Sequence, residues 1–397
     1  MTTTTTGNGA PRRVTILGST GSVGCNTIDL IERQPGAFEI EALTALKNVK
    51  KLAEQAIKLR PQIAVVADPA KYQELKDALA GTNIAVAAGP EALVEAARRP
   101  AEWVMSAIVG AAGLKATLAA VMRGACVALA NKESLVCAGE LMTRAVARYG
   151  ATLLPVDSEH NAIFQCFESD RRKSIEKLIL TGSGGPFRTR KREDLKDVTP
   201  EQACAHPNWV MGAKISVDSA TMMNKGLEVI EAHHLFAMAE ERIEVLVQPQ
   251  SIIHSMVAYE DGSVLAQLGS PDMRTPIAYT LAWPKRMPAP SARLDFVKIA
   301  QITFEPPDPV KFPALRLARQ ALKHGGTAPI VLNAANEVAV AHFLGRHIGF
   351  LDITSVVEDT LTAMPAEPID SLEQVHAVDA EARAVAERVA GGRARRN

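Results

Sequence analysis

From residue 12 to residue 130 the chain alternates short apolar runs with longer amphipathic stretches. The apolar runs cover residues 14–17, 38–44, 63–67, 104–109 and 126–130, and stretches at 24–33, 49–59 and 72–80 carry apolar residues at helical spacing. Strands and helices that alternate in this way form a parallel sheet with helices on both faces. The pattern predicts an α/β fold class with an N-terminal Rossmann-like parallel sheet.

The alternation loosens near residue 153, and the rest of the chain follows other patterns. Residues 151–290 mix helical stretches with strands expected at 175–181 and 251–267, the latter broken by an Asp261-Gly262 hairpin turn. Prolines then gather at 284–313, as in an extended linker. From Ala314 onward Ala, Leu, Glu, Arg and Val recur at helical spacing. We expect a central α+β catalytic domain and a C-terminal α-helical bundle.

Composition excludes several classes of partner. Lys and Arg total 44, as do Asp and Glu, so the formal net charge is zero and we expect no nucleic-acid surface. The five cysteines include no Cys-x-x-Cys pair, which favours reduced thiols in a cytoplasmic protein. The polar residues 1–10 lack the apolar core of a signal peptide, and no apolar run approaches membrane-spanning length. We therefore expect no membrane partner.

A glycine-rich turn joins the first predicted strand to the first helix. Residues 18–24 read GSTGSVG, with Gly-x-x-Gly-x-x-Gly spacing. Glycine lets the backbone approach a pyrophosphate, and the helix N-terminus behind it offers N–H groups and a favourable dipole. Lys47 and Asn48 follow the second strand with no acidic residue, which favours the 2′-phosphate of NADP over NAD. The alternative is that Lys47 only solvates a helix start.

Polar residues also follow the strand at 126–130, in the order Asn131-Lys132-Glu133-Ser134. Ligands of α/β proteins bind beyond the carboxyl ends of parallel strands. Lys132, between an amide and a carboxylate, is therefore well placed to hold a substrate oxygen. The alternative is an ordinary helix start with Asn131 as its cap.

Two carboxylates, a hydroxyl and an imidazole occur together in Asp157-Ser158-Glu159-His160, after the apolar run 151–154. If the chain is still extended there, Asp157 and Glu159 point to the same side and repel unless a cation or a shared proton relieves them. Hard divalent cations such as Mg²⁺ and Mn²⁺ prefer such oxygen ligands. The alternatives are a solvated acidic turn and a helix N-cap.

A second cluster lies at 218–228, DSATMMNKGLE. If residues 219–231 are helical, Asn224 and Glu228 share one face, with Lys225 adjacent. Ser219, Asn224 and Lys225 provide hydrogen-bond donors for a phosphate, and Glu228 could be a third carboxylate for the metal. The alternative is a capped amphipathic helix.

Two further segments could contact a ligand. Residues 180–187 form a strand that opens into a Gly/Ser turn, where backbone N–H groups and Ser183 could cradle an anion, or which could be a plain turn. Residues 205–212 carry Trp209, one of three tryptophans, in an expected loop. A lid over a ligand and an anchor to the core are both consistent with that tryptophan.

Taken together, these motifs resemble the 1-deoxy-D-xylulose 5-phosphate reductoisomerase family. The resemblance covers nearly the whole chain beyond the N-terminal tail, with the motifs in family order: GSTGSVG (18–24), AIVGAAGL (107–114), ANKESLV (130–136), PVDSEHNAIFQC (155–166), LTGSGGPFR (180–188), HPNW-x-MG (206–212), DSATMMNKGLE (218–228) and NAANE (333–337). It implies an NADPH-dependent and divalent-metal-dependent oxidoreductase. The implied reaction rearranges 1-deoxy-D-xylulose 5-phosphate and reduces it to 2-C-methyl-D-erythritol 4-phosphate, on the route to isoprenoid precursors.

The resemblance also implies roles for individual residues. The implied metal ligands are Asp157, Glu159 and Glu228, for one Mg²⁺, Mn²⁺ or Co²⁺ ion. The implied catalytic residues are Glu159, Lys132 and His160, and the implied substrate contacts are Lys132, Ser158, Glu159, Ser183, His206, Trp209, Ser219, Asn224 and Lys225, with Met211 beside them. The implied NADPH contacts are Thr20, Gly21, Ser22, Val23, Lys47, Asn48, Asn131, Glu133 and Gly212.

One position departs from the family pattern. The family usually has glycine just before the lysine of the second-strand loop, and this chain has Leu46 there. Because Leu46 has a side chain where the family has none, it affects the expected backbone contact to the 2′-phosphate at this position, but not the expected contact of Lys47. Two other functions stay open: a metal-independent oxidoreductase such as a semialdehyde dehydrogenase, which needs a reactive cysteine, and a non-catalytic NADP-sensing or scaffold protein.

The expected organisation is a disordered tail at 1–11 and an NADPH-binding Rossmann-like domain at 12–155. A catalytic and connective domain follows at 156–290, with a mobile loop near 204–212, and then a linker at 291–313 and a helical domain at 314–397. The family further implies a homodimer that acts on a small phosphosugar.

Overall fold

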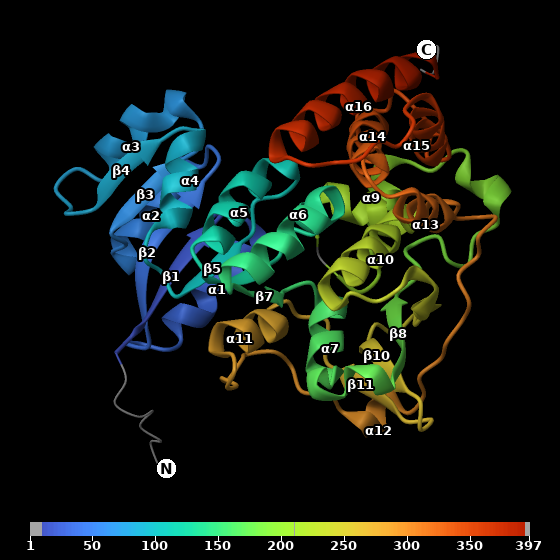
Figure 1. Cartoon of the computed structure of the whole chain (residues 1–397), viewed down its shortest axis with the longest axis horizontal. Helices are drawn as coiled ribbons and strands as arrows, with labels where there is room; N and C mark the ends of the chain where they lie inside the picture. The colour runs from blue at the N-terminus through green and yellow to red at the C-terminus, as the bar shows by residue number, and fades with distance from the viewer. Residues whose placement is uncertain (1–9, 210, 394–397) are drawn as a thin grey trace. The chain divides into compact units, whose positions relative to one another are not determined.

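The computed structural model describes residues 10–209 and 211–393, and it divides into two compact units (Figure 1). The first unit comprises residues up to Asn131, Ala145–Val156 and Met273–Pro290. The second comprises Lys132–Arg144, Asp157–Asp272 and the residues from Ser291 onward. Most of the predicted tail at 1–11 lies outside the described residues, so it stays a prediction.

The strands are β1 Arg12–Leu17, β2 Phe38–Ala45, β3 Ile63–Val66, β4 Ala85–Ala88, β5 Trp103–Ser106, β6 Cys126–Leu129, β7 Thr152–Pro155, β8 Ile175–Gly182, β9 Ile243–Val247, β10 Ile253–Tyr259 and β11 Val264–Leu268. The α-helices are α1 Ser22–Glu32, α2 Val49–Leu59, α3 Tyr72–Ala78, α4 Pro90–Arg98, α5 Leu114–Met122, α6 Glu133–Tyr149, α7 Ser158–Cys166, α8 Pro200–Cys204, α9 Ala213–Thr221, α10 Met223–Phe236, α11 Arg274–Ala282, α12 Phe296–Ile299, α13 Ala314–His324, α14 Ala328–Leu344, α15 Asp352–Ala363 and α16 Leu372–Gly392. Short 3₁₀ turns occur at Pro69–Lys71, Ala111–Gly113, Ser169–Ser174, Arg192–Leu195 and Glu240–Arg242.

The first unit is built on a seven-stranded sheet in the order β4-β3-β2-β1-β5-β6-β7, with every neighbouring pair parallel. Its central strands, such as β5 and β6, are buried on both faces, as the apolar runs of the sequence predict, whereas the edge strand β4 is not. Strand β1 lies between β2 and β5, so the chain reverses its direction of winding there. The crevice beyond the carboxyl ends of β1 and β5 is the place where such sheets bind ligands. The predicted Rossmann-like sheet is confirmed.

The second unit contains a four-stranded sheet in the order β11-β10-β8-β9. Strands β10 and β11 form the predicted hairpin, and β10 also pairs antiparallel with β8, while β9 lies parallel to β8. Helices α13 to α16 form the C-terminal helical region (Figure 1). One hydrophobic core holds Leu178 of β8 and Leu227 of α10 together with Leu332 of α14 and Val357 of α15.

The two compact units divide the chain at other residues than the predicted domains do. Met273–Pro290, expected in the central domain, packs in the first unit, where Trp103 Nε1 donates to the Thr280 carbonyl at 3.0 Å and Arg12 donates to that of Leu281 at 2.7 Å. Residues 132–144, expected in the first domain, belong to the second unit. The segment 291–313 does not separate two cores, because the central and C-terminal segments share the core described above. That segment instead pairs with β9 through Glu305 and Val247.

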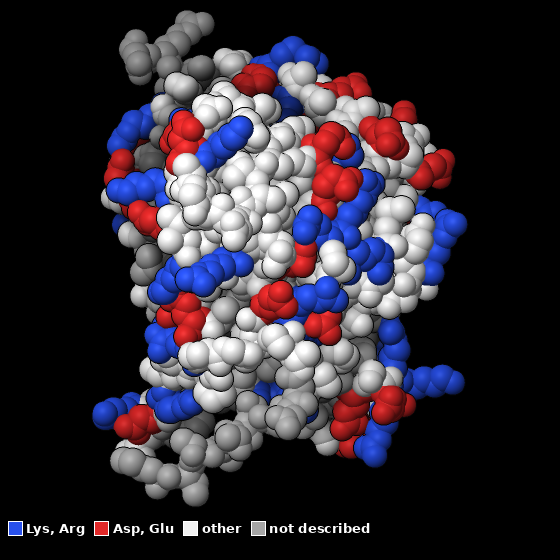
Figure 2. All heavy atoms as spheres, turned by 90° about the vertical axis from the view of Figure 1, so that its left-hand side faces the viewer, with Lys and Arg blue, Asp and Glu red and all other residues white. Residues whose placement is uncertain are grey.

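On the face drawn in Figure 2, basic and acidic side chains are interspersed, and no large region of the surface carries charges of one sign only. This distribution agrees with the formal net charge of zero. Among the described helices, none combines the length and the apolar character needed to cross a bilayer.

The shared core predicts that the central and C-terminal segments unfold together. Leu332→Ala removes a fully buried side chain and should lower the free energy of unfolding by about 2–5 kcal/mol. In hydrogen exchange, amides of β8 should lose protection together with those of α14. Leu265→Ala, at a side chain that is 42% exposed, is the matched control and should change stability by less than about 0.5 kcal/mol. Loss of protection confined to α13–α16 would contradict a shared core.

Candidate active site

Three carboxylates converge in the second unit, from two helices. Asp157 occupies the N-cap position of α7, Glu159 lies in its first turn, and Glu228 projects from α10. One oxygen from each lies within 4.8 Å of the other two. The extended chain considered for Asp157–Glu159 is wrong, because α7 begins at Ser158. The donor set consists of hard oxygens, which fits a divalent cation such as Mg²⁺.

Two lysines pair with these carboxylates. Lys225 Nζ lies 2.8 Å from Glu159 Oε1 and also contacts Glu228 Oε2. Lys132 Nζ contacts Asp157 Oδ2, lies 3.4 Å from Glu228 Oε1 and donates to Asn224 Oδ1 at 2.9 Å. With all five groups ionised, two ammonium groups and three carboxylates leave one negative charge. The cluster therefore retains an electrostatic preference for a further cation.

The pKa values of Glu228 and Glu159 are shifted in opposite directions. Burial, followed by the charge of Glu159, raises the pKa of Glu228 to about 8 against the opposing lysines. Burial also acts to raise the pKa of Glu159, but the charge of Lys225 and hydrogen bonds from Lys225 and Ser158 outweigh it and lower that pKa. Burial acts to lower the pKa of Lys132, and Asp157 and Glu228 reverse this and raise it well above its usual value. At neutral pH the cluster therefore holds a proton on Glu228, which a metal ion would displace.

The backbone between α9 and α10 separates two groups of predicted contacts. Met222 lies at the break with φ +64°, a left-handed conformation that is strained for a residue with a side chain. Ser219 precedes the break on α9, whereas Asn224 and Lys225 follow it in the first turn of α10. Asn224 also donates to Glu228 Oε1, so its side chain lies among the carboxylates.

The predicted phosphate contacts gather around the turn after β8. Gly185 has φ +70°, and a side chain there would lie 2.7 Å from the Ser219 carbonyl oxygen, so only glycine allows this approach. Ser183 Oγ accepts a hydrogen bond from the Gly185 N–H at 3.1 Å. Lys225 reaches the same strand end, where it donates to the Thr181 carbonyl at 2.5 Å. Ser183, Ser219 and Lys225 thus lie at one end of β8.

The 204–212 segment is tied to this turn through His206. His206 Nδ1 accepts from the backbone N–H groups of Asn208 and Trp209, at 3.2 and 3.0 Å. The proton of the neutral ring is therefore on Nε2, which donates to Ser183 Oγ at 2.9 Å. Burial lowers the pKa of His206 and favours this neutral form. The Trp209 ring lies 6.1 Å from that of His254, on β10.

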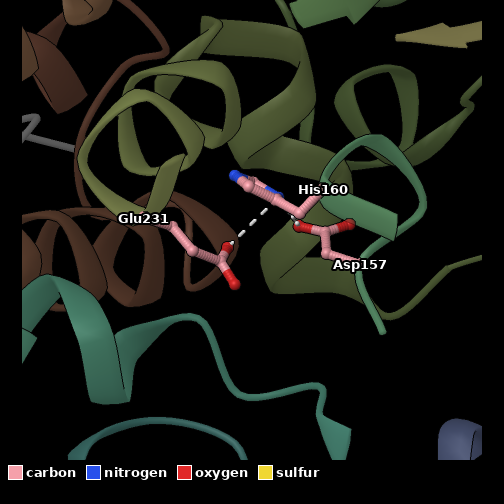
Figure 3. A group of neighbouring side chains, drawn as sticks. All are labelled: Asp157, His160 and Glu231. Atoms are coloured by element: carbon pink, nitrogen blue, oxygen red, sulfur yellow. Dashed lines mark ion pairs between the residues drawn. The ribbon is translucent and has the colours of Figure 1, made fainter. Parts of the chain in front are cut away.

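His160 lies between the carboxylates of Asp157 and Glu231, as Figure 3 shows. Its ring is fully buried, and Nε2 donates to the backbone carbonyl of Glu228 at 2.9 Å. Its Nδ1 faces two carboxylates, 3.5 Å from Glu231 Oε2 and 3.8 Å from Asp157 Oδ2. Burial raises the pKa of Glu231 to about 7, partly offset by His160. His160 thus links α7, which carries it, to α10, and its expected catalytic role stays a prediction.

In the first unit, the glycine-rich turn has the form expected of a dinucleotide site. Gly21 is the N-cap of α1, and Thr20, Ser22 and Val23 flank it at the helix start. A side chain at Gly24 would lie 2.4 Å from the Gly18 carbonyl oxygen, so the turn can close only with glycine there. The first N–H groups of the 11-residue helix α1 lie directly after this turn, an arrangement that fits a pyrophosphate.

The other predicted cofactor contacts have different surroundings. Lys47 and Asn48 are exposed between β2 and α2. Leu46 is 68% exposed, and its carbonyl accepts from the Asp68 N–H at 3.0 Å. Asn131 is buried and donates to the Gly110 carbonyl at 2.9 Å, so its amide shapes a loop of the first unit. Glu133 and Gly212 belong to the second unit, where Glu133 lies 3.5 Å from Lys214 Nζ.

Comparison with known proteins identifies the family. A model of 1-deoxy-D-xylulose 5-phosphate reductoisomerase matches residues 14–139, a model of its C-terminal domain matches 153–236, and a further DXP reductoisomerase C-terminal domain matches 268–385. The 1-deoxy-D-xylulose 5-phosphate reductoisomerase of Rhodospirillum centenum is 64% identical over 392 residues, 98% of each chain. The chain belongs to the 1-deoxy-D-xylulose 5-phosphate reductoisomerase family. The enzyme of that name from Zymomonas mobilis is 61% identical over 374 residues, 94% of this chain and 96% of its own.

Solved reductoisomerase structures share the fold. The Zymomonas mobilis reductoisomerase in complex with NADPH has a TM-score of 0.92 at 58% identity and covers 96% of this chain and 99% of its own. A reductoisomerase in complex with NADPH, fosmidomycin and magnesium has a TM-score of 0.90 at 41% identity and covers 96% of this chain and 98% of its own. The predicted α/β fold class and the predicted family are both confirmed.

Several polar side chains next to the predicted site residues were not singled out in the sequence. Glu231 follows Glu228 by three residues on α10, and that helical spacing was its one available signal. His254 lies within the apolar run of β10, where nothing local distinguishes it. Lys214 lies 2.8 Å from Asp218 Oδ2, and Asn336 of the NAANE motif donates to Asp218 Oδ1 at 2.8 Å. The Lys214–Asp218 pair lies within α9, whereas the Asn336–Asp218 bond joins α9 to α14 and becomes visible only in the fold.

The raised pKa of Glu228 predicts a pH-dependent metal affinity. Below pH about 8 a divalent cation must displace the Glu228 proton, so affinity should rise with pH by up to about tenfold per unit and level off above that pKa. Mn²⁺ titration followed by electron paramagnetic resonance, from about pH 6 to pH 9, measures the slope. Glu228→Gln should flatten it, whereas Glu244→Gln, at an ion pair with Lys177, should leave it unchanged. An affinity independent of pH in the wild-type chain would contradict the assignment.

Proposed function

We propose that this chain converts 1-deoxy-D-xylulose 5-phosphate to 2-C-methyl-D-erythritol 4-phosphate, using NADPH and a divalent cation. The observation that carries the proposal is the convergence of Asp157, Glu159 and Glu228 in a chain 64% identical to a reductoisomerase. Relatives with NADPH and magnesium in their structures support the choice of both cofactors. The product supplies the non-mevalonate route to isoprenoid precursors.

The three carboxylates would hold one divalent cation, for which we favour Mg²⁺. When bound, the cation polarises the substrate carbonyl and stabilises alkoxide charge. Lys132 keeps its proton, because Asp157 and Glu228 raise its pKa, and it offers hydrogen bonds to substrate oxygens. Ser158 Oγ, 2.5 Å from Glu159 Oε2, is placed to orient a substrate hydroxyl, and Glu159 is placed to accept a proton from it.

The phosphate of the substrate would lie at the end of β8. Ser183, Ser219 and Lys225 supply hydrogen-bond donors there, and His206 reaches the same turn through its bond to Ser183. Binding energy from this group, remote from the reacting carbons, can be used to position the substrate. We assign the 204–212 segment, with Trp209 and Met211, the role of a loop that closes over the substrate.

The glycine-rich turn would hold the NADPH pyrophosphate, with Lys47 and Asn48 near the 2′-phosphate. NADPH supplies the hydride that reduces the rearranged aldehyde. In this assignment the glycine-rich turn and the Lys47–Asn48 loop of the first unit bind the cofactor, and the second unit binds metal and substrate. We further propose that the chain is cytoplasmic, as its scattered cysteines favour, and that it forms a homodimer, as the resemblance to the family implies.

The alternative of a cysteine-dependent semialdehyde dehydrogenase has less support. Burial raises the pKa of the Cys126, Cys137 and Cys204 thiols, which disfavours a reactive thiolate at these positions. A non-catalytic NADP-binding scaffold is disfavoured by the cost of burying carboxylates and lysines without a ligand to use them.

The proposed reaction is tested by following NADPH absorbance with 1-deoxy-D-xylulose 5-phosphate as substrate. Absorbance should fall in the presence of Mg²⁺, and EDTA should abolish the decrease because the carboxylate cluster then lacks its cation. Restoring Mg²⁺ in excess should restore turnover. Turnover that survives complete metal removal would support a metal-independent oxidoreductase instead.

Glu228→Gln separates metal binding from cofactor binding. The neutral amide is a poor ligand, so turnover should fall by at least about a hundredfold. NADPH affinity, measured by fluorescence titration, should stay nearly unchanged because the glycine-rich turn belongs to the other unit. Glu244→Gln serves as the control, since it neutralises a carboxylate of the same unit outside the cluster. A Glu228→Gln variant that is active and saturable with metal would show that the third ligand is misassigned.

A further inference from the structure

Gln55, on α2, forms a two-point contact with the glycine-rich turn of the first unit. Its Nε2 donates to the Ser19 backbone carbonyl at 3.0 Å, and its Oε1 accepts from Ser19 Oγ at 2.8 Å. Gln55 is 9% exposed and Ser19 is fully buried. Because the nitrogen and the oxygen of the Gln55 amide both form hydrogen bonds with Ser19, Gln55 fixes both the position and the orientation of Ser19.

The same turn is also held by the end of β2. The Ser19 N–H donates to the Thr44 carbonyl at 2.8 Å, and the Gly18 N–H donates to Thr44 Oγ1 at 3.0 Å. Thr44 lies one residue before the end of β2, so these bonds continue the sheet into the turn. Ser19 is therefore held from two sides, by the strand through Thr44 and by the following helix through Gln55.

Helix α2 begins at the loop assigned to the 2′-phosphate. Asn48 is its N-cap and accepts from the Lys51 N–H at 3.2 Å, directly after Lys47. Asn48 and Gln55 are seven residues apart, which is close to two helical turns, so they share one face of α2. A single rigid element thus connects the Lys47–Asn48 loop to the turn assigned to the pyrophosphate.

We propose that Gln55 is a positioning residue for the dinucleotide. It fixes the distance between the glycine-rich turn and the Lys47–Asn48 loop, and that distance governs the preference for a cofactor with a 2′-phosphate. The inference rests on the proposed function, because it assumes that both segments bind NADPH. Gln55 itself is buried against Ser19 and acts through the backbone of the turn. The pyrophosphate and the 2′-phosphate of NADPH are attached to the same ribose, so both can be bound only if the two segments keep the right separation.

The test measures the dissociation constants of NADPH and NADH by fluorescence titration for Gln55→Leu, which removes both hydrogen bonds at similar volume. NADPH should bind about tenfold more weakly, as expected for the loss of buried hydrogen bonds, and NADH about twofold more weakly at most, so the preference for NADPH falls. At saturating NADPH, kcat and the KM for 1-deoxy-D-xylulose 5-phosphate should stay within about twofold of wild type. Ser19→Ala keeps one of the two bonds and should show a smaller change of the same kind.

Trp103→Phe is the matched control. It removes another buried hydrogen bond of the first unit, to the Thr280 carbonyl, and should lower Tm without changing either dissociation constant. A Gln55→Leu chain with lowered Tm but unchanged cofactor affinities would overturn the proposal, as would equal weakening of NADPH and NADH binding. If Gln55→Leu does not fold, Ser19→Ala decides by the same criteria. Failure of the wild-type chain to bind NADPH would instead refute the proposed function.

Discussion

Compensation of buried negative charge is the constraint on which the proposed site depends. Asp157, Glu159 and Glu228 place oxygens within 4.8 Å of one another, and Glu228 is fully buried. Such a group is unstable without cations, because burial and mutual repulsion both disfavour ionisation. Lys132 and Lys225 supply part of the compensation, and the proton held by Glu228 supplies more. A bound divalent cation would replace that proton, so the folded chain is prepared for metal by the same forces that would otherwise destabilise it.

The surrounding fold holds these groups in place. Helix α10 carries Glu228 and Lys225 and shares a hydrophobic core with α14 and α15, so the C-terminal helices support the proposed metal ligand Glu228 although none of their residues belongs to the cluster. His160 and Glu231 connect α7 to α10 behind the carboxylates. In the first unit, Thr44 and Gln55 hold the glycine-rich turn in a comparable way. In both units, buried residues that were not singled out in the sequence, such as Glu231 and Gln55, hold the predicted site residues in position.

Prediction from sequence succeeded where the signal was local. The helix expected at 49–59 is α2 with the same bounds, and the hairpin at Asp261-Gly262 joins β10 to β11, since periodicity and turn chemistry act over a few residues. Strand β4 (Ala85–Ala88) was not predicted, because alanine carries little strand preference. The domain boundaries needed revision because Met273–Pro290 packs against the first unit through contacts such as Trp103 with Thr280, 177 residues apart in the chain.

The sequence by itself determined the alternation of strands and helices at 12–130, the parallel sheet, the family and the residue types of the site, because these follow from periodicity, glycine spacing and long motifs. Only the tertiary structure decided which groups meet and in what state. His160 of α7 donates to the Glu228 carbonyl, 68 residues away, and Gln55 of α2 binds Ser19, 36 residues away, so both arrangements depend on contacts between distant segments. The pKa of Glu228 likewise depends on burial and on neighbours up to 96 residues away, which no local pattern encodes.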